Sequence, residues 1–353
     1  MENNTNFASR VLKDVIKGRD IAQSEVEKFF RLILDHKLGI ANDTTFGAFF
    51  AALQTKGPTV AEILGLTNVV LNYDRVLIPY DEDPENLCGI VGSGKDDLKT
   101  FNVSTCAAIV AAACGVKVVK NGSRSESSVA GTTDVLEKLG FPIHLKPEQV
   151  TSLLEQTNFT FCDAEPYFPR MKKEYVGKFL FPHPLSYTLS IASGLRFGRI
   201  VFGISFEDTE LVADVISGLD FSTFMIVAGH DETGKSLDEI STVGPTKITQ
   251  QIGGTRKTYT LRPTDLDLKM SAFNEIKQGD SVAENAEIFI NVLTGKRVDG
   301  ALDIVALNTA ALLLIAGKVT TLLEGIQQAK ASIKLGDAYK KFLHITQLAA
   351  SYE

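Results

Sequence analysis

The chain has 353 residues, 36 Lys and Arg against 43 Asp and Glu, and a formal net charge of −7; it is 44% hydrophobic and 22% charged. These values are typical of a globular protein and exclude a disordered or fibrous one. The acidic balance argues against a dedicated nucleic-acid-binding protein, and no apolar run reaches the ~18 residues that cross a bilayer. The polar N-terminus lacks a basic and apolar leader, so we expect a cytoplasmic protein.

The first part of the chain, residues 6 to about 75, predicts helices and no strand, because its apolar residues recur at helical spacing. Ser24 with Glu27, and Thr59 with Glu62, each predict a capping box that begins a helix. An aromatic run in this part lies either in a dimer interface or in the internal core, and the sequence does not choose between them. Its members are Phe46, Phe49 and Phe50.

From about residue 87, short apolar runs alternate with helical stretches, which indicates βα units and a parallel sheet. The predicted strands are Leu87–Val91, Val116–Val119, Phe159–Cys162, Arg199–Ile204 and Thr223–Ala228. The predicted helices between them are Thr105–Cys114, Val129–Leu139, Pro147–Glu155 and Thr209–Leu219. Lys247–Gln251 and Lys257–Leu261 flank Gly253-Gly254 and predict a hairpin. The end is predicted to be helical over Ser281–Leu293, Asp303–Gly317, Val319–Leu335 and Ala338–Ser351.

A glycine-rich loop, Gly92-Ser93-Gly94-Lys95-Asp96-Asp97, follows the first predicted strand and precedes a helix that begins near Asn102-Val103-Ser104-Thr105. Glycines allow close backbone approach to a ligand, and helix N-terminal N–H groups with nearby hydroxyls bind anions. Asp96 or Asp97 is compatible with a phosphate only if Mg²⁺ or a sugar hydroxyl lies between. An NTPase P-loop is not predicted, since Asp96 stands where the motif needs Ser or Thr. A glycine turn without a ligand is the simplest alternative.

Two further loops follow predicted strands and belong to the same edge of the sheet, where open α/β sheets bind ligands. Lys120 and Arg124 in the loop after Val116–Val119 predict, together with the glycine loop, a phosphate pocket. Asp238 and Glu239 suit Mg²⁺, which prefers carboxylates, waters and substrate phosphate. Their alternative is a helix N-terminal turn capped by Ser236. No Cys or His spacing predicts a zinc enzyme.

These stretches resemble the core of the anthranilate phosphoribosyltransferase family, which carries GTGGDG, FNIST, KHGNR and SGSADVLExLG motifs. The matching stretches here read GSGKDD, FNVST, KNGSR and AGTTDVLEKLG, in the same order. The likeness extends to Lys56–Ile63, Leu237–Thr246 and Asp303–Lys318.

The resemblance implies an α/β fold with a small helical domain and a larger α/β domain whose central sheet is mainly parallel. It implies a helical domain over 1–75, joined by about 166–195, and an α/β domain over 76–165 and 196–353. It also implies a homodimer that associates through the helical domain.

The activity implied by the resemblance is that of a Mg²⁺-dependent glycosyltransferase in tryptophan biosynthesis. It transfers 5-phosphoribose from phosphoribosyl diphosphate to the amine nitrogen of anthranilate or a related aromatic acceptor. The implied substrate-binding residues are Gly92, Gly94, Lys95, Asp96, Asn102, Ser104, Thr105, Lys120, Asn121, Gly122, Ser123 and Lys178. The implied Mg²⁺ ligands are Ser104, Asp238 and Glu239. No general acid or base is assigned, since catalysis by positioning and charge neutralisation suffices.

The sequence departs from the family pattern in two places. Two glycines of GTGGDG are Lys95 and Asp97 here, which adds charge beside the predicted phosphates. On the acceptor side, the His and Asn of KHGN are Asn121 and Ser123, and Lys178 replaces an Arg, without its bidentate fork. His183 is either a new acceptor contact or a core or surface residue. These changes keep open a different acceptor, a nucleoside-phosphorylase-like activity, and a non-catalytic relative.

Overall fold

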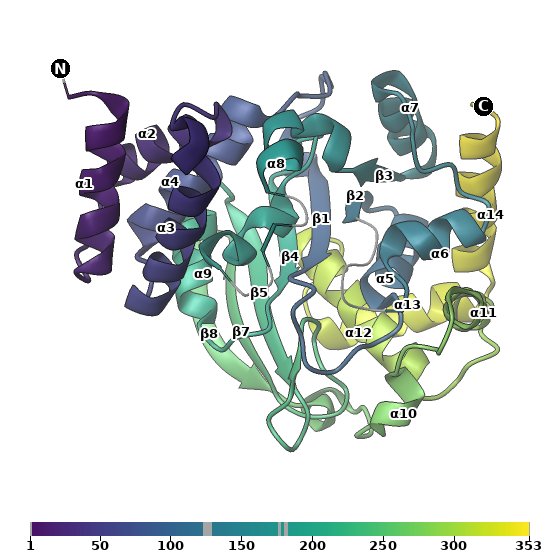
Figure 1. The fold of residues 1–353 in the computed structure, drawn as a ribbon. Helices are drawn as coiled ribbons and strands as arrows, with labels where there is room; N and C mark the ends of the chain where they lie inside the picture. Colours follow the sequence, from purple (N-terminus) through teal and green to yellow (C-terminus); the bar gives the residue numbers. More distant parts are fainter. Residues whose placement is uncertain (1, 123–128, 176–177, 180–182, 353) are drawn as a thin grey trace.

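The computed structural model describes residues 2–122, 129–175, 178–179 and 183–352 of the chain. A bundle of helices at the N-terminus lies beside a central sheet, and most of the C-terminal helices cover the other side of that sheet (Figure 1). The bundle contains α1 (Asn4–Ile16), α2 (Gln23–Leu34), α3 (Asn42–Lys56), α4 (Val60–Asn68) and the π-helical turn η2 (Val69–Asp74).

The aromatic run of α3 forms the core of this bundle. Phe46, Phe49 and Phe50 are at most 1% exposed, and the ring of Phe49 lies 4.3 Å from that of Phe29, between centroids. Burying one such side chain stabilises the fold by roughly 1.5–3 kcal/mol. The core alternative is therefore correct for all three residues, and they do not form a dimer interface.

The two predicted capping boxes have different outcomes. At α4 the hydroxyl of Thr59 accepts from the Glu62 N–H while the Glu62 carboxylate accepts from the Thr59 N–H, as predicted. The box predicted from Ser24 and Glu27 is wrong, because α2 begins at Gln23 and its N-cap Ala22 offers no side-chain acceptor. The Glu27 carboxylate instead accepts from the side-chain amides of Gln23 and Asn68.

The sheet has the strand order β3-β2-β1-β4-β5-β7-β8, and β6 pairs with β5 outside this path. The parallel strands are β1 (Leu87–Gly92), β2 (Lys117–Gly122), β3 (Phe159–Asp163), β4 (Arg199–Gly203) and β5 (Thr223–His230). Antiparallel strands complete it: β6 (Ser236–Leu237), and the hairpin of β7 (Thr246–Ile252) and β8 (Thr255–Leu261). All five predicted parallel strands and the hairpin are confirmed.

The two faces of the sheet belong to two hydrophobic cores, because side chains alternate along each strand. On β4, Ile200 and Phe202 point to the core shared with the helical bundle. Val201 points to the opposite core, which contains the apolar helices that follow β1 and end the chain. The sheet is thus buried on both faces, as parallel sheets usually are.

The helices that cover the sheet agree with the predicted ones to within a few residues. Those between strands are α5 (Val103–Ala113), α6 (Thr132–Lys138), α7 (Pro147–Thr157) and α9 (Thr209–Gly218). Those after the hairpin are α10 (Phe273–Ile276), α11 (Val282–Leu293), α12 (Gly300–Ile315), α13 (Leu322–Lys334) and α14 (Asp337–Ala350). The short α10 has no periodic signal and is not predicted by the sequence.

The segment after β3 returns to the helical bundle. Its short helices are η4 (Glu165–Tyr167), α8 (Pro169–Glu174), η5 (Pro184–Tyr187) and η6 (Leu189–Ile191). α8 packs against α2 and η2, and η5 packs against α3 and α4. The Asp74 carboxylate accepts from the backbone N–H groups of Arg170 and Met171, which fixes α8 to the end of the bundle. The domain division at 75, 166 and 195 stays a prediction.

No helix in the described ranges is both long and apolar enough to pass through a bilayer. The cytoplasmic location stays a prediction.

Candidate active site

The candidate site begins where β1 and β4 end, which is the point at which the strand order reverses. Gly92 and Gly203 are register partners at the carboxyl ends of these strands. A Cβ at Gly92 would lie 2.6 Å from an Asp238 carboxylate oxygen, and one at Gly203 would lie 1.5 Å from the Asp238 carbonyl oxygen. Only glycine at both positions leaves room for Asp238. Ligands of open α/β sheets bind at such a switch point.

Three carboxylates gather at this edge. Asp96, Asp238 and Glu239 each offer an oxygen, and these oxygens lie within 4.8 Å of one another. The loop that carries Asp238 and Glu239 follows the short strand β6, so the alternative of a helix turn capped by Ser236 is wrong.

Backbone and hydroxyl donors hold these carboxylates in place. The Gly94 N–H donates to Asp238 at 2.6 Å, and the Thr100 hydroxyl donates to Glu239 at 3.0 Å. The second oxygen of Glu239 is buried and accepts no hydrogen bond from the part of the chain that the structure describes. A buried carboxylate oxygen without a donor is costly unless a cation occupies the space beside it.

The electrostatics of the cluster are unfavourable in the absence of a cation. Burial and the neighbouring Asp96 charge raise the pKa of Asp238 to about 7. Burial and the charge of Asp238 raise the pKa of Glu239 well above its usual range, and burial also raises that of Asp96. Lys99 neutralises Asp96, whose carboxylate lies 2.9 Å from the ammonium. The oxygen donor set and the excess negative charge suit Mg²⁺.

The altered glycine loop is fixed to strand β6. The Asp97 carboxylate accepts from the N–H and the hydroxyl of Ser236, at 3.0 and 2.8 Å. The Asp97 N–H donates in return to the Ser236 hydroxyl. These bonds lower the pKa of Asp97. Asp97, the second substitution in the loop, therefore fixes the loop to β6 through Ser236.

Asn308, which the sequence analysis missed, holds the loop that carries Asp238 and Glu239. Asn308, in the middle of apolar α12, accepts from the Ile240 N–H and donates to the Ile240 carbonyl. An amide inside an otherwise apolar helix was the available signal, because a buried Asn needs partners. Gly229 was missed as well: a Cβ there would lie 2.3 Å from the Glu239 carbonyl oxygen.

The cationic side of the site comes from the end of β2. Lys120 is 3% exposed and its ammonium donates to the Asn121 carbonyl at 2.7 Å. Burial lowers the pKa of Lys120 to about 8, although the nearby charges of Asp238 and Glu239 oppose this shift. Both amide atoms of Asn121 are buried and have no hydrogen-bond partner among the described residues. A polar ligand satisfies such groups.

The N-terminus of α5 completes the arrangement. Asn102 is its N-cap residue but makes no capping bond, and its side-chain oxygen is buried without a partner in the described ranges. Ser104 and Thr105 lie in the first turn, whose N–H groups have no acceptor inside the helix. The hydroxyl of Thr105 lies 3.4 Å from that of Thr132 at the start of α6. This end of α5 suits an anion.

The remaining predicted residues lie elsewhere or outside the described residues. Ser123 and Arg124 fall in the range 123–128, which the structure does not describe. Gly122 ends β2, where a Cβ would lie 2.6 Å from the Phe161 ring. Lys178 lies against the helical bundle, and its ammonium is 3.3 Å from Asp43 and 3.4 Å from Glu174.

His183 is a core residue. It is 2% exposed, its ring stacks on Phe50 with centroids 5.0 Å apart, and Nε2 lies 2.5 Å from the Tyr175 hydroxyl. Burial, helped by the charge of Lys95, lowers the pKa of His183 to about 4. Lys95 itself is exposed, and its charge lies near enough to act on His183.

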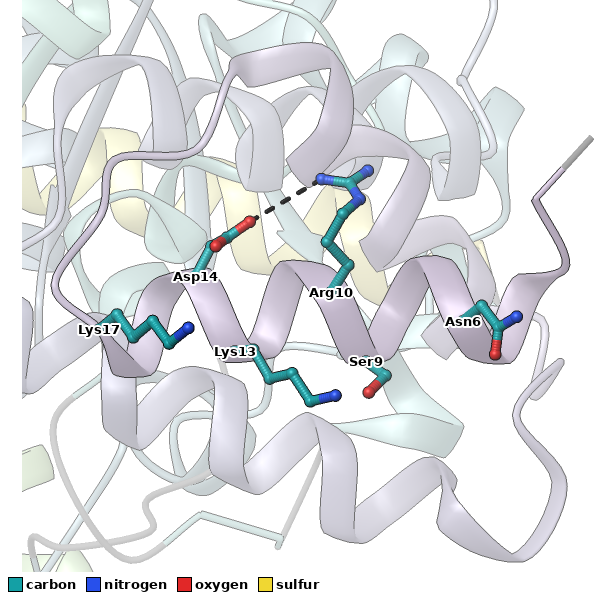
Figure 2. A pocket seen from close by; sticks show the side chains of 6 residues that line it. All are labelled: Asn6, Ser9, Arg10, Lys13, Asp14 and Lys17. Atoms are coloured by element: carbon teal, nitrogen blue, oxygen red, sulfur yellow. Dashed lines mark ion pairs between the residues drawn. The ribbon is translucent and has the colours of Figure 1, made fainter.

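A hollow on the outer face of α1 is a weaker candidate. It is lined by Asn6, Ser9, Arg10, Lys13, Asp14 and Lys17 (Figure 2). Arg10 already pairs with Glu25 at 2.8 Å and approaches Asp14 at 4.0 Å. Helix α1 lies at the outer side of the bundle, away from the strand ends (Figure 1). The hollow therefore lacks the converging, unsatisfied groups of the sheet edge.

The chain matches family models for both of its parts. Residues 85–339 match the model described as glycosyl transferase family, a/b domain, and residues 9–73 match glycosyl transferase family, helical bundle domain.

Related proteins and structures are similar over nearly their whole length. The anthranilate phosphoribosyltransferase of Chloroherpeton thalassium is 33% identical over 93% of this chain and 94% of its own, and that of Alkaliphilus metalliredigens is 32% identical over 96% and 98%. The crystal structure of the Thermus thermophilus enzyme covers 96% of this chain and 99% of its own, with a TM-score of 0.85 and 26% identity. The Saccharomyces cerevisiae enzyme, solved in complex with PRPP and Mg, covers 98% of both chains with a TM-score of 0.82 and 24% identity, and shows the shared fold. The chain therefore belongs to the anthranilate phosphoribosyltransferase family of glycosyltransferases.

Proposed function

We propose that this protein is a Mg²⁺-dependent phosphoribosyltransferase that transfers 5-phosphoribose from phosphoribosyl diphosphate to the amine of anthranilate or a related aromatic acceptor. Such a step belongs to tryptophan biosynthesis. The observation that carries the proposal is the trio of Asp96, Asp238 and Glu239, with the buried Lys120 beside it at the β1–β4 switch point. Relatives with this activity at about 32% identity support it.

In this proposal the unsatisfied groups at the sheet edge bind the donor. Asp238 and Glu239, with Ser104 from α5, hold Mg²⁺, which when bound neutralises negative charge on the departing diphosphate. Asn102, Thr105 and the first-turn N–H groups of α5 contact the diphosphate. The glycine-rich loop covers the diphosphate, as the sequence predicts, with Gly92, Gly94, Lys95 and Asp96. Lys120, whose pKa of about 8 keeps it mostly protonated at neutral pH, adds a buried positive charge.

The reaction is an exchange of substituents at the anomeric carbon. The bond from this carbon to the diphosphate oxygen breaks, and the amine nitrogen forms a bond to the same carbon and releases a proton. Positive charge builds on the ribose as diphosphate leaves. The chain contributes position and fixed charge, which is the main source of catalysis when no strong base is needed.

Calorimetry with phosphoribosyl diphosphate, with and without Mg²⁺, tests the donor part. We expect Mg²⁺-dependent binding in the natural protein and its loss in Asp238→Asn. Asp280→Asn, whose side chain is 89% exposed on the surface, is the matched control and should bind normally. Binding that ignores Mg²⁺ and survives Asp238→Asn would remove the proposal.

Turnover tests the acceptor part. Loss of anthranilate fluorescence is followed with donor and Mg²⁺ present, and formation of diphosphate is measured in parallel. Consumption of anthranilate is the expected result. Mg²⁺-dependent donor binding without anthranilate turnover would move the assignment to another aromatic amine, because Asn121 replaces the family's histidine beside the site.

We also propose that the protein forms a homodimer through the outer face of the helical bundle. Ile16, at the end of α1, is 64% exposed, and Ile40, before α3, is fully exposed. Light scattering after size exclusion should give twice the mass of 38.3 kDa. Ile16→Asp with Ile40→Asp should give the monomer mass, and a monomeric natural protein would contradict the proposal.

A further inference from the structure

A second cavity lies at the opposite edge of the sheet, where the parallel strands begin. It has a volume of about 330 Å³ and is walled by residues that come just before β1, β4 and β5 and by the end of the helical bundle. Its lining residues are Asn68, Leu71, Asn72, Arg75, Asp83, Pro84, Glu85, Ile191, Leu195, Arg196, Phe197, Gly198, Gly218, Leu219, Asp220 and Phe221. None of them belongs to the candidate active site.

Arg75 is the central feature of this cavity. It follows the π-helical turn η2, and such turns often occur at functional sites. The Nε of Arg75 is buried and has no hydrogen-bond partner among the described residues, and its guanidinium forms no ion pair with any of them. A half-buried guanidinium without an acid is unfavourable by itself.

A second arginine makes the local charge more positive. Arg196 also lines the cavity, is exposed, and forms no ion pair within the described ranges. Burial, with the charge of Arg196, lowers the pKa of Arg75 to about 10. Two arginines held close together without an anion between them are typical of a site that binds a carboxylate or phosphate, because the guanidinium fork matches both.

Three acidic residues also line the cavity, and none of them forms an ion pair with Arg75 or Arg196 in the described ranges. The Asp83 carboxylate accepts from the Glu85 N–H. The Glu85 carboxylate accepts from the Ser222 hydroxyl at 2.6 Å and lies 3.9 Å from Arg199. The third acid, Asp220, lies just after the C-terminal end of α9. A hydrogen-bond donor of a ligand would be favourable beside it, and a second negative charge would be unfavourable.

The rest of the wall is apolar. The rings of Phe197 and Phe221 lie 5.8 Å apart between centroids, and Leu71, Ile191 and Leu195 add aliphatic surface. A bare inorganic anion would leave this surface in contact with water. A ligand with one carboxylate and an apolar body satisfies both the arginines and the apolar wall.

We propose that this cavity is a binding site for a small carboxylate with an aromatic or aliphatic body, whose carboxylate lies between Arg75 and Arg196. The ligand would contact both segments that connect the helical bundle with the sheet, 75–86 and 191–198. A molecule that binds there stabilises one relative position of the two parts and thereby acts as an effector at a distance from the strand ends. The proposal does not depend on the function proposed above.

Calorimetry with 3-phenylpropionate tests this site directly, and anthranilate is left out because it is itself a small aromatic carboxylate. The natural protein should bind one equivalent. Arg75→Met should weaken the affinity at least tenfold and Arg196→Met at least threefold. The neutral amide, 3-phenylpropanamide, should bind at least tenfold more weakly than the acid. Arg262→Met removes an exposed arginine paired with Glu232 and is the matched control, with unchanged affinity.

The melting temperature of each ligand-free variant separates a ligand site from a structural role. If Arg75 has a structural role, its removal lowers the melting temperature. If it is an uncompensated guanidinium, its removal leaves the ligand-free protein equally or more stable. If Arg75→Met does not fold, Arg196→Met decides, because that side chain is exposed. Absence of saturable 3-phenylpropionate binding, or equal affinity in the arginine variants and the control, would overturn the proposal.

Discussion

The two edges of the sheet hold charged groups of opposite sign that lack ion-pair partners among the described residues. At the carboxyl edge, Asp238 and Glu239 lie together without a basic ion-pair partner among the described residues. At the amino edge, Arg75 and Arg196 lie together without an acid that pairs with them in the same part of the chain. Lys330 and Asp303, in contrast, form an ion pair with each other. Unpaired charge held by the frame of the fold therefore marks the places where a ligand belongs.

The edges differ in how firmly they hold their charges. The carboxyl edge fixes Asp238 with the Gly94 N–H and with the close approach of Gly92 and Gly203. At the amino edge, Arg75 follows η2, and its Nε forms no hydrogen bond with the described residues. Rigid groups suit a reaction that requires exact positions, whereas a looser pair suits binding alone.

The largest expected effect is at the carboxyl edge. Asp238→Asn keeps the size of the side chain but removes one of two unpaired carboxylates, so kcat/KM with phosphoribosyl diphosphate should fall by about 100-fold or more. Steady-state kinetics at several Mg²⁺ concentrations measures this.

The control for that measurement is Arg75→Met at the other edge, which without an effector should keep kcat/KM within about twofold. A loss of similar size in both variants would mean that the two edges act as one site and would break the comparison.

The second effect is on stability and depends on pH. The pKa of Asp238 in the folded protein, about 7, lies above its ordinary value of 3.8. The folded state therefore holds this proton more tightly than the unfolded state, and the stability that it provides is lost as the pH rises toward and through 7. In metal-free protein, Asp238→Asn should raise the free energy of unfolding at pH 8 by about 1–2 kcal/mol.

Urea denaturation at pH 8 and pH 5 measures this difference. The stabilising effect of Asp238→Asn should shrink at pH 5, because the natural carboxyl is then mostly protonated in the folded state. Added Mg²⁺ should stabilise the natural protein more than the variant. If Asp238→Asn is less stable than the natural protein at pH 8 without metal, the ionised Asp238 carboxylate does not destabilise the folded state.

The sequence predicts much of the carboxyl edge and none of the amino edge. Glycines, hydroxyls and acids directly after predicted strands identify the loops of Gly92, Lys120 and Asp238, because the carboxyl ends of parallel strands share one edge. Arg75 and Arg196 are far apart in the chain and each resembles a solvated surface residue. Only the packing of η2 against the returning segment reveals that they share a cavity.

Predictions from local sequence patterns are wrong where side chains from distant parts of the chain bind the same atoms. Glu27 has the right spacing for a capping box with Ser24, but Asn68, from a helix 41 residues away, donates to its carboxylate. The glycines Gly203 and Gly229 belong to no recognised motif, and their need to be glycine arises only when the backbone of Asp238 and Glu239 is folded over them.

A smaller effect is expected at the tether of the altered loop. Asp97→Gly restores the family's glycine but removes the acceptor for the N–H and hydroxyl of Ser236. We expect a loss of about 1 kcal/mol in the free energy of unfolding, since these partly exposed bonds are of ordinary strength. Asp97→Asn, which keeps one acceptor oxygen, should lose less. Equal stability of all three proteins in urea would show that the loop is not held by Asp97.

The smallest effect is expected from Lys178, whose ammonium is shared between Asp43 and Glu174 of the helical part. Its side chain is 34% exposed, and ion pairs of this kind contribute about 0–1 kcal/mol. Because Lys178 already serves two carboxylates, Lys178→Met should change the KM for anthranilate by less than threefold. The matched control is Lys173→Met, which also removes a lysine beside Glu174. A tenfold rise in KM for Lys178→Met alone would show that the lysine leaves its ion pairs to bind the acceptor, and would add a third ligand-binding charge to the two edges of the sheet.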